Sequence, residues 1–337
     1  MKILFDHHLP FSLAHGGLQT QIQQTKAALE RAGVEIEFLR WWDGGQKGDA
    51  IHFFTAPGAS YLEHARSLRL PVVATQLLSE TCNRSDGRLR RQGLCVKAAL
   101  ALPFAGGVKR QLTWNTYRLC SRNIVGLEAE ARVLKTVYGV PPDRISVVPL
   151  GLPEQFLRAG AGPRSENHLI CTGTITGWKN SVELAELSRA AEVPVLFVGK
   201  PYSDSDPYWL RFKALIDGRH VKYHPFVSDE TEMVRLLQQA RGFVLMSRYE
   251  NWCLSAHEAA ACGLPLLVQN QNWSKERFGS QARYFEHIGF SRRNVECLRR
   301  FWREAPGLRP PGIKLFSWAE VAETLRAVYE RVLSTSW

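Results

Sequence analysis

The segment from Ser247 to Glu258 holds side chains well suited to bind a polar ligand. Glu250 and Glu258 follow an apolar run that ends at Met246. In a parallel sheet the loops after the strands form the ligand crevice, so both carboxylates are expected there. Ser255 and Glu258 also have the spacing of a helix capping box. A carboxylate can equally accept hydrogen bonds from two vicinal hydroxyls, such as those of a ribose, so both interpretations of Glu258 stay open.

Two further loops place glycines or a lysine just before a helix, where a phosphate group can bind. Gly16 and Gly17 follow the first apolar run, and glycines let backbone amides approach an anion at a positive helix end. Lys179 ends the loop Gly173 to Asn180, where its ammonium group could neutralise a diphosphate. A plain tight turn and a surface lysine are the simpler alternatives.

These loops need a scaffold, and the pattern of apolar runs predicts an α/β fold. Short apolar runs alternate with helix-period segments in both halves, as expected of parallel sheets covered by helices. The predicted strands span residues 3–5, 35–39, 50–54, 72–75 and 123–126 in the first half, and 168–172, 193–198, 221–224, 242–246 and 265–268 in the second. The sequence therefore predicts two open parallel sheets, one in each half.

A glycine- and proline-rich stretch divides the two halves. Residues 151–167 read as an interdomain linker. Near the end of the chain, Ser317 and Glu320 have capping-box spacing, and apolar residues then recur at helical intervals. The predicted parts are a first domain (1–155), a second domain (156–316) and a final amphipathic helix (317–337).

Composition narrows the class of protein. The 337 residues carry 43 Lys and Arg against 32 Asp and Glu, a formal charge of +11, which suits anionic partners or is simply a solvated basic surface. Seven cysteines without a C-x-x-C pair argue for reduced thiols and against a zinc site. We find no signal-peptide core and no run of about 18 apolar residues. A cytoplasmic protein is expected.

Taken together, the segments resemble a family-4 retaining glycosyltransferase of group 1 over almost the full length. Glu250 and Glu258 have the E-x7-E spacing of that family. The other similar segments are Arg31-Ala32-Gly33-Val34-Glu35, Tyr138-Gly139-Val140-Pro141-Pro142-Asp143-Arg144-Ile145-Ser146-Val147-Val148-Pro149-Leu150-Gly151-Leu152, Ala259-Ala260-Ala261-Cys262-Gly263-Leu264-Pro265 and Phe316-Ser317-Trp318. The resemblance implies a GT-B fold, in which two Rossmann-like domains face a central cleft and the last helix crosses back to the first domain.

The resemblance also implies roles for particular residues. Gly16, Gly17 and Lys179 would hold the donor diphosphate, with Thr174 and Arg248 beside it. Glu258 would bind the ribose hydroxyls. Glu250, with backbone amides of Trp252, Cys253 and Leu254, would orient the donor sugar, and Glu250 and Lys179 would be the catalytic residues. The leaving diphosphate would be stabilised electrostatically, and neither a metal nor another cofactor is implied.

The sequence departs from the family at three places. Thr174 stands where an arginine usually pairs with the lysine, and Arg248 or Lys200 could replace that charge. Asn251-Trp252-Cys253 replaces the usual Gly-Phe-Gly, which puts bulkier side chains next to the donor sugar. A histidine frequent after the fourth strand is absent around Gln76-Leu77. Because of these changes, the resemblance does not identify the donor sugar or establish that the chain is active.

A basic stretch in the first half suggests where an acceptor or membrane would bind. Arg88, Arg90, Arg91 and Lys97 precede the apolar run from Ala98 to Val108, and Lys109 and Arg110 follow it. Cations around an apolar segment are typical of docking on anionic lipid, although a solvated helix face before a buried helix would look the same. We expect a glycan, lipid-linked or lipopolysaccharide-type acceptor of polysaccharide biosynthesis and peripheral contact with the inner face of a membrane.

Three other functions are compatible with parts of the sequence. A basic nucleic-acid-binding protein would use the +11 charge and ten tryptophans, but these residues are not interleaved in one stripe. A nucleotide-sugar epimerase or phosphorylase would keep the fold, and an epimerase would need acid/base groups for which four histidines are available: His7, His8, His15 and His257. A relative that binds the donor without turnover would explain the missing arginine at position 174.

Overall fold

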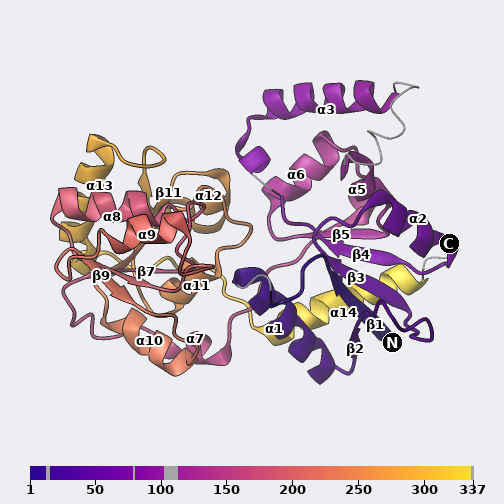
Figure 1. Cartoon of the computed structure of the whole chain (residues 1–337), viewed down its shortest axis with the longest axis horizontal. Coiled ribbons are helices and arrows are strands. Elements are labelled where there is room, and N and C mark those ends of the chain that lie inside the picture. The colour runs from indigo at the N-terminus through magenta and orange to yellow at the C-terminus, as the bar shows by residue number, and fades with distance from the viewer. Residues whose placement is uncertain (13–15, 79, 102–112, 335–337) are drawn as a thin grey trace. The chain divides into compact units, whose positions relative to one another are not determined.

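The computed structural model describes residues 1–12, 16–78, 80–101 and 113–334. These residues form two compact units, one comprising Met1–Gly151 with Trp318–Trp337 and the other Leu152–Ser317 (Figure 1). The predicted run Ala98 to Val108 lies mostly outside the described residues, as do His15, Lys109 and Arg110.

The first unit is built on a six-stranded parallel sheet in the order β2-β1-β3-β4-β5-β6. The strands are β1 (Lys2–His7), β2 (Glu35–Phe38), β3 (Ala50–Phe54), β4 (Val72–Thr75), β5 (Arg122–Val125) and β6 (Ile145–Val147). Its helices are α1 (Gly17–Arg31), α2 (Ala59–Ser67), α3 (Asp86–Ala101), α5 (Thr116–Leu119), α6 (Glu128–Thr136) and α14 (Trp318–Ser334). The mainly apolar strands β3 and β4 are buried along their length, as expected of a sheet covered on both faces.

The last helix completes the first unit. Figure 1 shows α14 in yellow beside α1. The apolar residues that recur at helical spacing in the sequence form its buried face: Trp318, Val321, Ala322, Leu325, Val328, Tyr329 and Val332. The Tyr329 hydroxyl lies 2.6 Å from His52 Nδ1, and His52 Nε2 lies 2.7 Å from the Thr75 hydroxyl. This buried hydrogen-bonded chain fixes α14 against β3 and β4.

The second unit has another six-stranded parallel sheet, in the order β12-β11-β10-β7-β8-β9. The strands are β7 (Leu169–Thr172), β8 (Val195–Val198), β9 (Val221–His224), β10 (Gly242–Leu245), β11 (Leu266–Gln269) and β12 (Arg283–Phe285). The helices are α7 (Glu154–Ala159), α8 (Ser181–Ala191), α9 (Pro207–Lys213), α10 (Glu230–Gln239), α11 (Leu254–Ala261), α12 (Asn272–Phe278) and α13 (Arg292–Glu304). This strand order is that of a doubly wound nucleotide-binding sheet, with its reversal between β7 and β10.

The predicted α/β class with two Rossmann-like domains is confirmed, and each predicted strand overlaps an observed one. Two strands, β6 and β12, were missed by the analysis of apolar runs. Both are three-residue edge strands in which only Phe285 is buried, so they lack the apolar pattern of the inner strands. Among the described helices none combines the length and apolar character needed to cross a membrane.

Candidate active site

The strand order of the second unit brings two predicted loops together. β7 and β10 are neighbours in the sheet, although 69 residues separate the end of β7 at Thr172 from the start of β10 at Gly242. Ligands of doubly wound sheets bind outside the carboxyl ends of the strands where the strand order reverses. The loop after β7 carries Lys179, and the loop after β10 carries Glu250. Both residues therefore lie at the expected crevice.

Asn180 joins the two loops. It is buried and adopts a left-handed conformation as the N-cap of α8. Its side-chain amide donates a hydrogen bond of 2.8 Å to the Met246 carbonyl, while the Trp178 carbonyl accepts one of 2.9 Å from the Arg248 amide. These two bonds cross between the loops, so the β7 loop and the β10 loop form one rigid structure.

Lys179 and Glu250 form an ion pair across this junction. The Lys179 ammonium group donates to Glu250 Oε1, and the side chains keep only 20% and 12% of their surface exposed. Burial opposes the charged form of Lys179, but the Glu250 carboxylate outweighs it and raises the pKa of Lys179. The lysine is therefore a fixed cation at the carboxyl end of β7, where a ligand phosphate would meet it.

The backbone beneath this pair is closely packed. Gly173, with φ of +148°, follows β7 and lies against the Lys179 side chain. A Cβ at Gly199, which follows β8, would lie 1.9 Å from the Gly173 carbonyl oxygen. The loops after β7 and β8 can approach this closely only because residue 199 is glycine.

We expect Gly199→Ala to destabilise the second unit and to disturb the loops that carry Lys179, because the added methyl group meets backbone rather than a flexible side chain. A loss of about 1–3 kcal/mol is typical of such overpacking. Urea unfolding would measure the loss, with Gly307→Ala as control, since a Cβ there meets nothing within 4 Å. Equal stability of the two variants would contradict this interpretation of Gly199.

The capping interpretation of Glu258 is wrong. α11 begins at Leu254, and its N-cap is Cys253, held at φ of +64°. Ser255 therefore lies inside the first turn, and it does not cap the helix. No hydrogen bond to the Glu258 carboxylate is formed within the described part of the chain. Burial, reinforced by the charge of Glu230, raises the pKa of Glu258 to about 7.

Three side chains are stacked next to the Glu250 loop. The rings of Trp252 and His257 are nearly parallel, with centroids 4.9 Å apart, and the Arg277 guanidinium lies 3.8 Å from the Trp252 centroid. His257 Nδ1 donates to the Cys253 carbonyl, and its Nε2 accepts from Arg277 at 3.4 Å. Burial lowers the pKa of His257 to about 4, so the ring is neutral and packs as part of the stack.

Arg277 was not predicted. It comes from α12, nineteen positions beyond Glu258 in the sequence, and only the packing of α12 on this loop brings it to Trp252. Burial lowers the pKa of Arg277, yet the guanidinium remains charged at neutral pH. The Trp252 ring thus supports a cation beside the Glu250 loop.

The remaining predicted residues of the second unit flank this arrangement. Thr174 lies in the β7 loop, and neither its side chain nor that of Leu254 is a cation that could neutralise phosphate. Arg248 Nε lies 3.5 Å from Asn180 Oδ1, and Lys200, after β8, stacks on Phe226 at 5.0 Å. Burial raises the pKa of Cys253 to about 12, so its thiol is not a nucleophile at neutral pH.

The predicted residues of the first unit occupy two separate places. Gly16 caps α1 with φ of +130°, a conformation that suits glycine, and Gly17 is the first residue of that helix. Arg88, Arg90, Arg91 and Lys97 are all exposed on α3. Two of the histidines considered for acid/base chemistry are hydrogen-bonded to backbone: His7 contacts the Leu9 carbonyl and His8 the Ala56 carbonyl.

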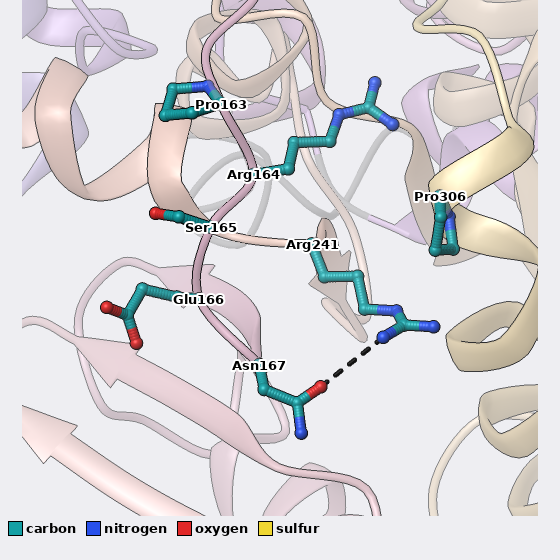
Figure 2. A pocket seen from close by; sticks show the side chains of 7 residues that line it. All are labelled: Pro163, Arg164, Ser165, Glu166, Asn167, Arg241 and Pro306. Carbon is teal, nitrogen blue, oxygen red and sulfur yellow. Dashed lines mark hydrogen bonds between the residues drawn. The ribbon is translucent and has the colours of Figure 1, made fainter.

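A cavity of about 360 Å³ lies at the opposite edge of the second sheet, before β7 and β10 (Figure 2). It is lined by Pro163, Arg164, Ser165, Glu166, Asn167, Arg241 and Pro306. Arg164 donates to the carbonyls of Ala305 and Gly263, and Arg241 to that of Trp302. Both guanidinium groups thus hold backbone together, and this cavity is distinct from the loops that carry Lys179 and Glu250.

Comparison with known proteins gives a family match over the segment that contains Lys179, Glu250 and Glu258. Residues 158–283 match the family model described as glycosyl transferases group 1. The chain is 24% identical over 222 residues to MMP alpha-(1->4)-mannosyltransferase of Mycolicibacterium hassiacum, an alignment covering 61% of this chain. It covers 53% of that relative, so the chain spans about half the length of the curated relative it matches.

Solved structures share the fold over nearly the whole chain. Sucrose-phosphate synthase (tll1590) from Thermosynechococcus elongatus superposes with a TM-score of 0.70 at 15% identity, covering 99% of this chain and all of that one. Anabaena Alr3699/HepE, solved in complex with UDP-glucose, gives 0.62 at 14% identity, covering 98% and 100%. These structures show the two-domain fold, and the family-model match supports glycosyltransferase as the enzyme class.

Proposed function

We propose that this chain is a retaining glycosyltransferase of the family-4 type that transfers a sugar from a nucleotide-sugar donor to a glycan or lipid-linked acceptor. The observation that carries the proposal is the ion pair of Lys179 and Glu250 at the reversal point of the second sheet, with the buried Glu258 carboxylate within reach of the Lys179 charge. The relative named as a mannosyltransferase and the similar structure solved with UDP-glucose support a nucleotide-sugar donor.

The donor would bind on the second unit. Lys179 supplies positive charge to the diphosphate. Arg248 and Lys200, in the loops after β10 and β8, supply the charge of the arginine absent at position 174. Glu258, whose carboxylate has no protein hydrogen bond among the described residues, accepts the two ribose hydroxyls. In the first unit, Gly16 and Gly17 at the start of α1 present backbone amides of the kind that bind phosphate.

Transfer would proceed on one face of the donor sugar. The bond between the anomeric carbon and the diphosphate oxygen breaks, and the acceptor hydroxyl oxygen forms the new bond on that same face. The acceptor proton passes to the departing phosphate oxygen, so no protein nucleophile is required. The protein's part is electrostatic: Lys179 stabilises the charge that develops on the leaving diphosphate. We propose that these cations and helix ends act without a metal.

A thermal-shift screen tests this donor site. UDP, GDP, ADP and TDP, with their common sugar conjugates, are compared on the wild type and on Glu258→Ala. A ligand at 100 times its Kd stabilises a protein by about 2.7 kcal/mol, so one nucleotide series should raise Tm clearly. The variant should lose that shift. If oligonucleotides stabilise the protein and no nucleotide sugar does, a nucleic-acid-binding function replaces the proposal.

The acceptor surface is proposed to include α3 and to meet an anionic membrane on its cytoplasmic side. α3 buries Leu89, Gly93 and Val96 and exposes its four predicted cations together with Leu94, which is 66% exposed. A Cβ at Gly93 would lie 2.3 Å from the Thr136 carbonyl oxygen, so the α3 backbone packs directly against the end of α6. The outward face combines charge with apolar area, as interfacial helices do.

Vesicle sedimentation tests this surface. Each cation near an anionic bilayer contributes about 1 kcal/mol, so replacing Arg88, Arg90, Arg91 and Lys97 by alanine should lower binding to vesicles containing phosphatidylglycerol at least tenfold at low salt. A matched variant loses the same charge elsewhere, at the exposed Lys213, Arg219, Lys275 and Arg303. Equal losses in both variants would mean that net charge alone, and not α3, drives binding.

A further inference from the structure

Two neighbouring tryptophans project from the first unit into solvent. Trp41 is 75% exposed and Trp42 is 84% exposed, more than any other tryptophan among the described residues. Neither indole makes a ring contact or a side-chain hydrogen bond with the part of the chain that the structure describes. Exposing two adjacent indoles is unfavourable in water, so a function of this surface has to be considered.

The turn that presents these tryptophans is held rigidly on both sides. Arg40 donates to the Asp43 carboxylate at 2.8 Å and 3.0 Å and to Glu37 at 2.9 Å. Gln46 accepts from the Arg40 amide at 2.8 Å and donates to Glu37 at 2.8 Å. The backbone on either side of the two indoles is therefore fixed before any ligand binds, which limits the entropy lost on binding.

The charges around the turn favour an uncharged ligand. The guanidinium of Arg40 is paired with Glu37 and Asp43. Residues 37–49 contain three carboxylates and two cations, so the segment has a slight negative charge. Lys2 also pairs with Glu37, so the turn is close to neutral and lacks the row of cations that α3 would offer an anionic lipid or phosphate. A pyranose ring matches this surface, because its apolar C–H face stacks on an indole while its hydroxyls accept from the free indole N–H.

The turn also lies at the functional edge of its sheet. It follows β2, whose last residue, Phe38, pairs with Phe5 of β1. The loop that leads to Gly16 and Gly17 follows β1, so both loops leave the carboxyl edge of the same parallel sheet. This is the edge at which ligands of such sheets bind.

We propose that Trp41 and Trp42 form a stacking surface for an uncharged sugar ring of the acceptor. Identifying this sugar as part of the acceptor rests on the proposed glycosyltransferase function. The binding of a neutral saccharide to the two tryptophans can be measured independently of that function. It assigns the acceptor a saccharide part, and it separates this surface from the cationic face of α3.

The experiment measures saccharide binding in the absence of any nucleotide. Saturation-transfer NMR is recorded with maltotriose, cellotriose, α-linked mannotriose and chitotriose on the wild type, on Trp41→Ala/Trp42→Ala, on Trp41→Phe/Trp42→Phe and on Phe290→Ala. Phe290 is the matched control, since it is 53% exposed on the second unit. At least one trisaccharide should bind the wild type and the control, lose at least tenfold in affinity with the alanine pair, and recover in part with the phenylalanine pair.

The other outcomes overturn the inference. If no trisaccharide binds, or if the alanine pair binds as well as the wild type, the tryptophans are not a saccharide surface. A blue shift of tryptophan fluorescence on neutral phosphatidylcholine vesicles that the alanine pair abolishes, without saccharide binding, identifies a membrane contact instead. The nucleotide screen is scored separately: a normal Tm shift with failed saccharide binding refutes this surface alone, and the reverse pattern refutes the donor site alone.

Discussion

Lys179→Met should lower kcat by about 10²–10³-fold with the nucleotide sugar identified by thermal shift, because removing one fixed charge at a leaving group typically costs that much. The substitution keeps the apolar stem of the side chain and removes only the cation. Donor Kd should change less than kcat, since the charge on the diphosphate is greatest as the bond to the sugar breaks. Steady-state assays that detect the released nucleoside diphosphate measure kcat, and nucleotide titration measures the donor Kd.

The ion pair supplies the control for this variant. Removing Lys179 leaves the Glu250 carboxylate, only 12% exposed, without its partner, so Lys179→Met alone should also lower stability. The double variant Lys179→Met/Glu250→Gln removes both charges and should recover stability without recovering turnover. Turnover of the single variant within threefold of the wild type would contradict the electrostatic role of Lys179.

Glu258→Gln should weaken nucleotide binding and at the same time stabilise the free protein at alkaline pH. Hydrogen bonds to a charged group contribute about 1.5–3 kcal/mol each, so losing the carboxylate that faces two ribose hydroxyls should raise Kd by ten- to a hundredfold or more at pH 8. In the wild type, Kd should increase as pH falls through about 7, where Glu258 becomes protonated. Titration calorimetry between pH 6 and 8 measures this dependence.

The stability effect of Glu258 has the opposite sign. Burial raises its folded-state pKa to about 7, above the ordinary value of 4.5, so its contribution to stability is fully present below pH 4.5 and is lost as pH rises through 7. Glutamine cannot ionise, so Glu258→Gln should gain up to about 3 kcal/mol relative to the wild type between pH 5 and pH 8. A difference between the two proteins that does not change with pH would exclude a perturbed carboxyl at this position.

The fold could be read from the sequence because its signals are local. Most inner strands are short, mainly apolar runs buried on both faces, and such runs are visible without knowing their partners. The edge strands Ile145–Val147 and Arg283–Phe285 are partly exposed, so their composition does not separate them from loops. The seven buried positions of α14 follow from helical periodicity in the same way.

The candidate site could be read only in part. The order of the loops along the chain suggested Lys179, Glu250 and Glu258, but spacing alone left open a capping box formed by Ser255 and Glu258. The left-handed backbone at Cys253 starts the helix one residue before Ser255 and removes that possibility. A positive φ at a cysteine is imposed by the surrounding packing, and no sequence motif announces it.

By itself, the sequence determined the α/β class, the two halves, most strands and the loops in which charged residues follow strands, because hydrophobic periodicity and helix-start signals act over a few residues. Only the tertiary structure decided that β7 and β10 are neighbours, that Asn180 joins their loops, that Arg277 stacks on Trp252, and that the pKa of Glu258 is near neutral. These properties depend on contacts between residues far apart in the chain and on exclusion of water, which no local pattern records.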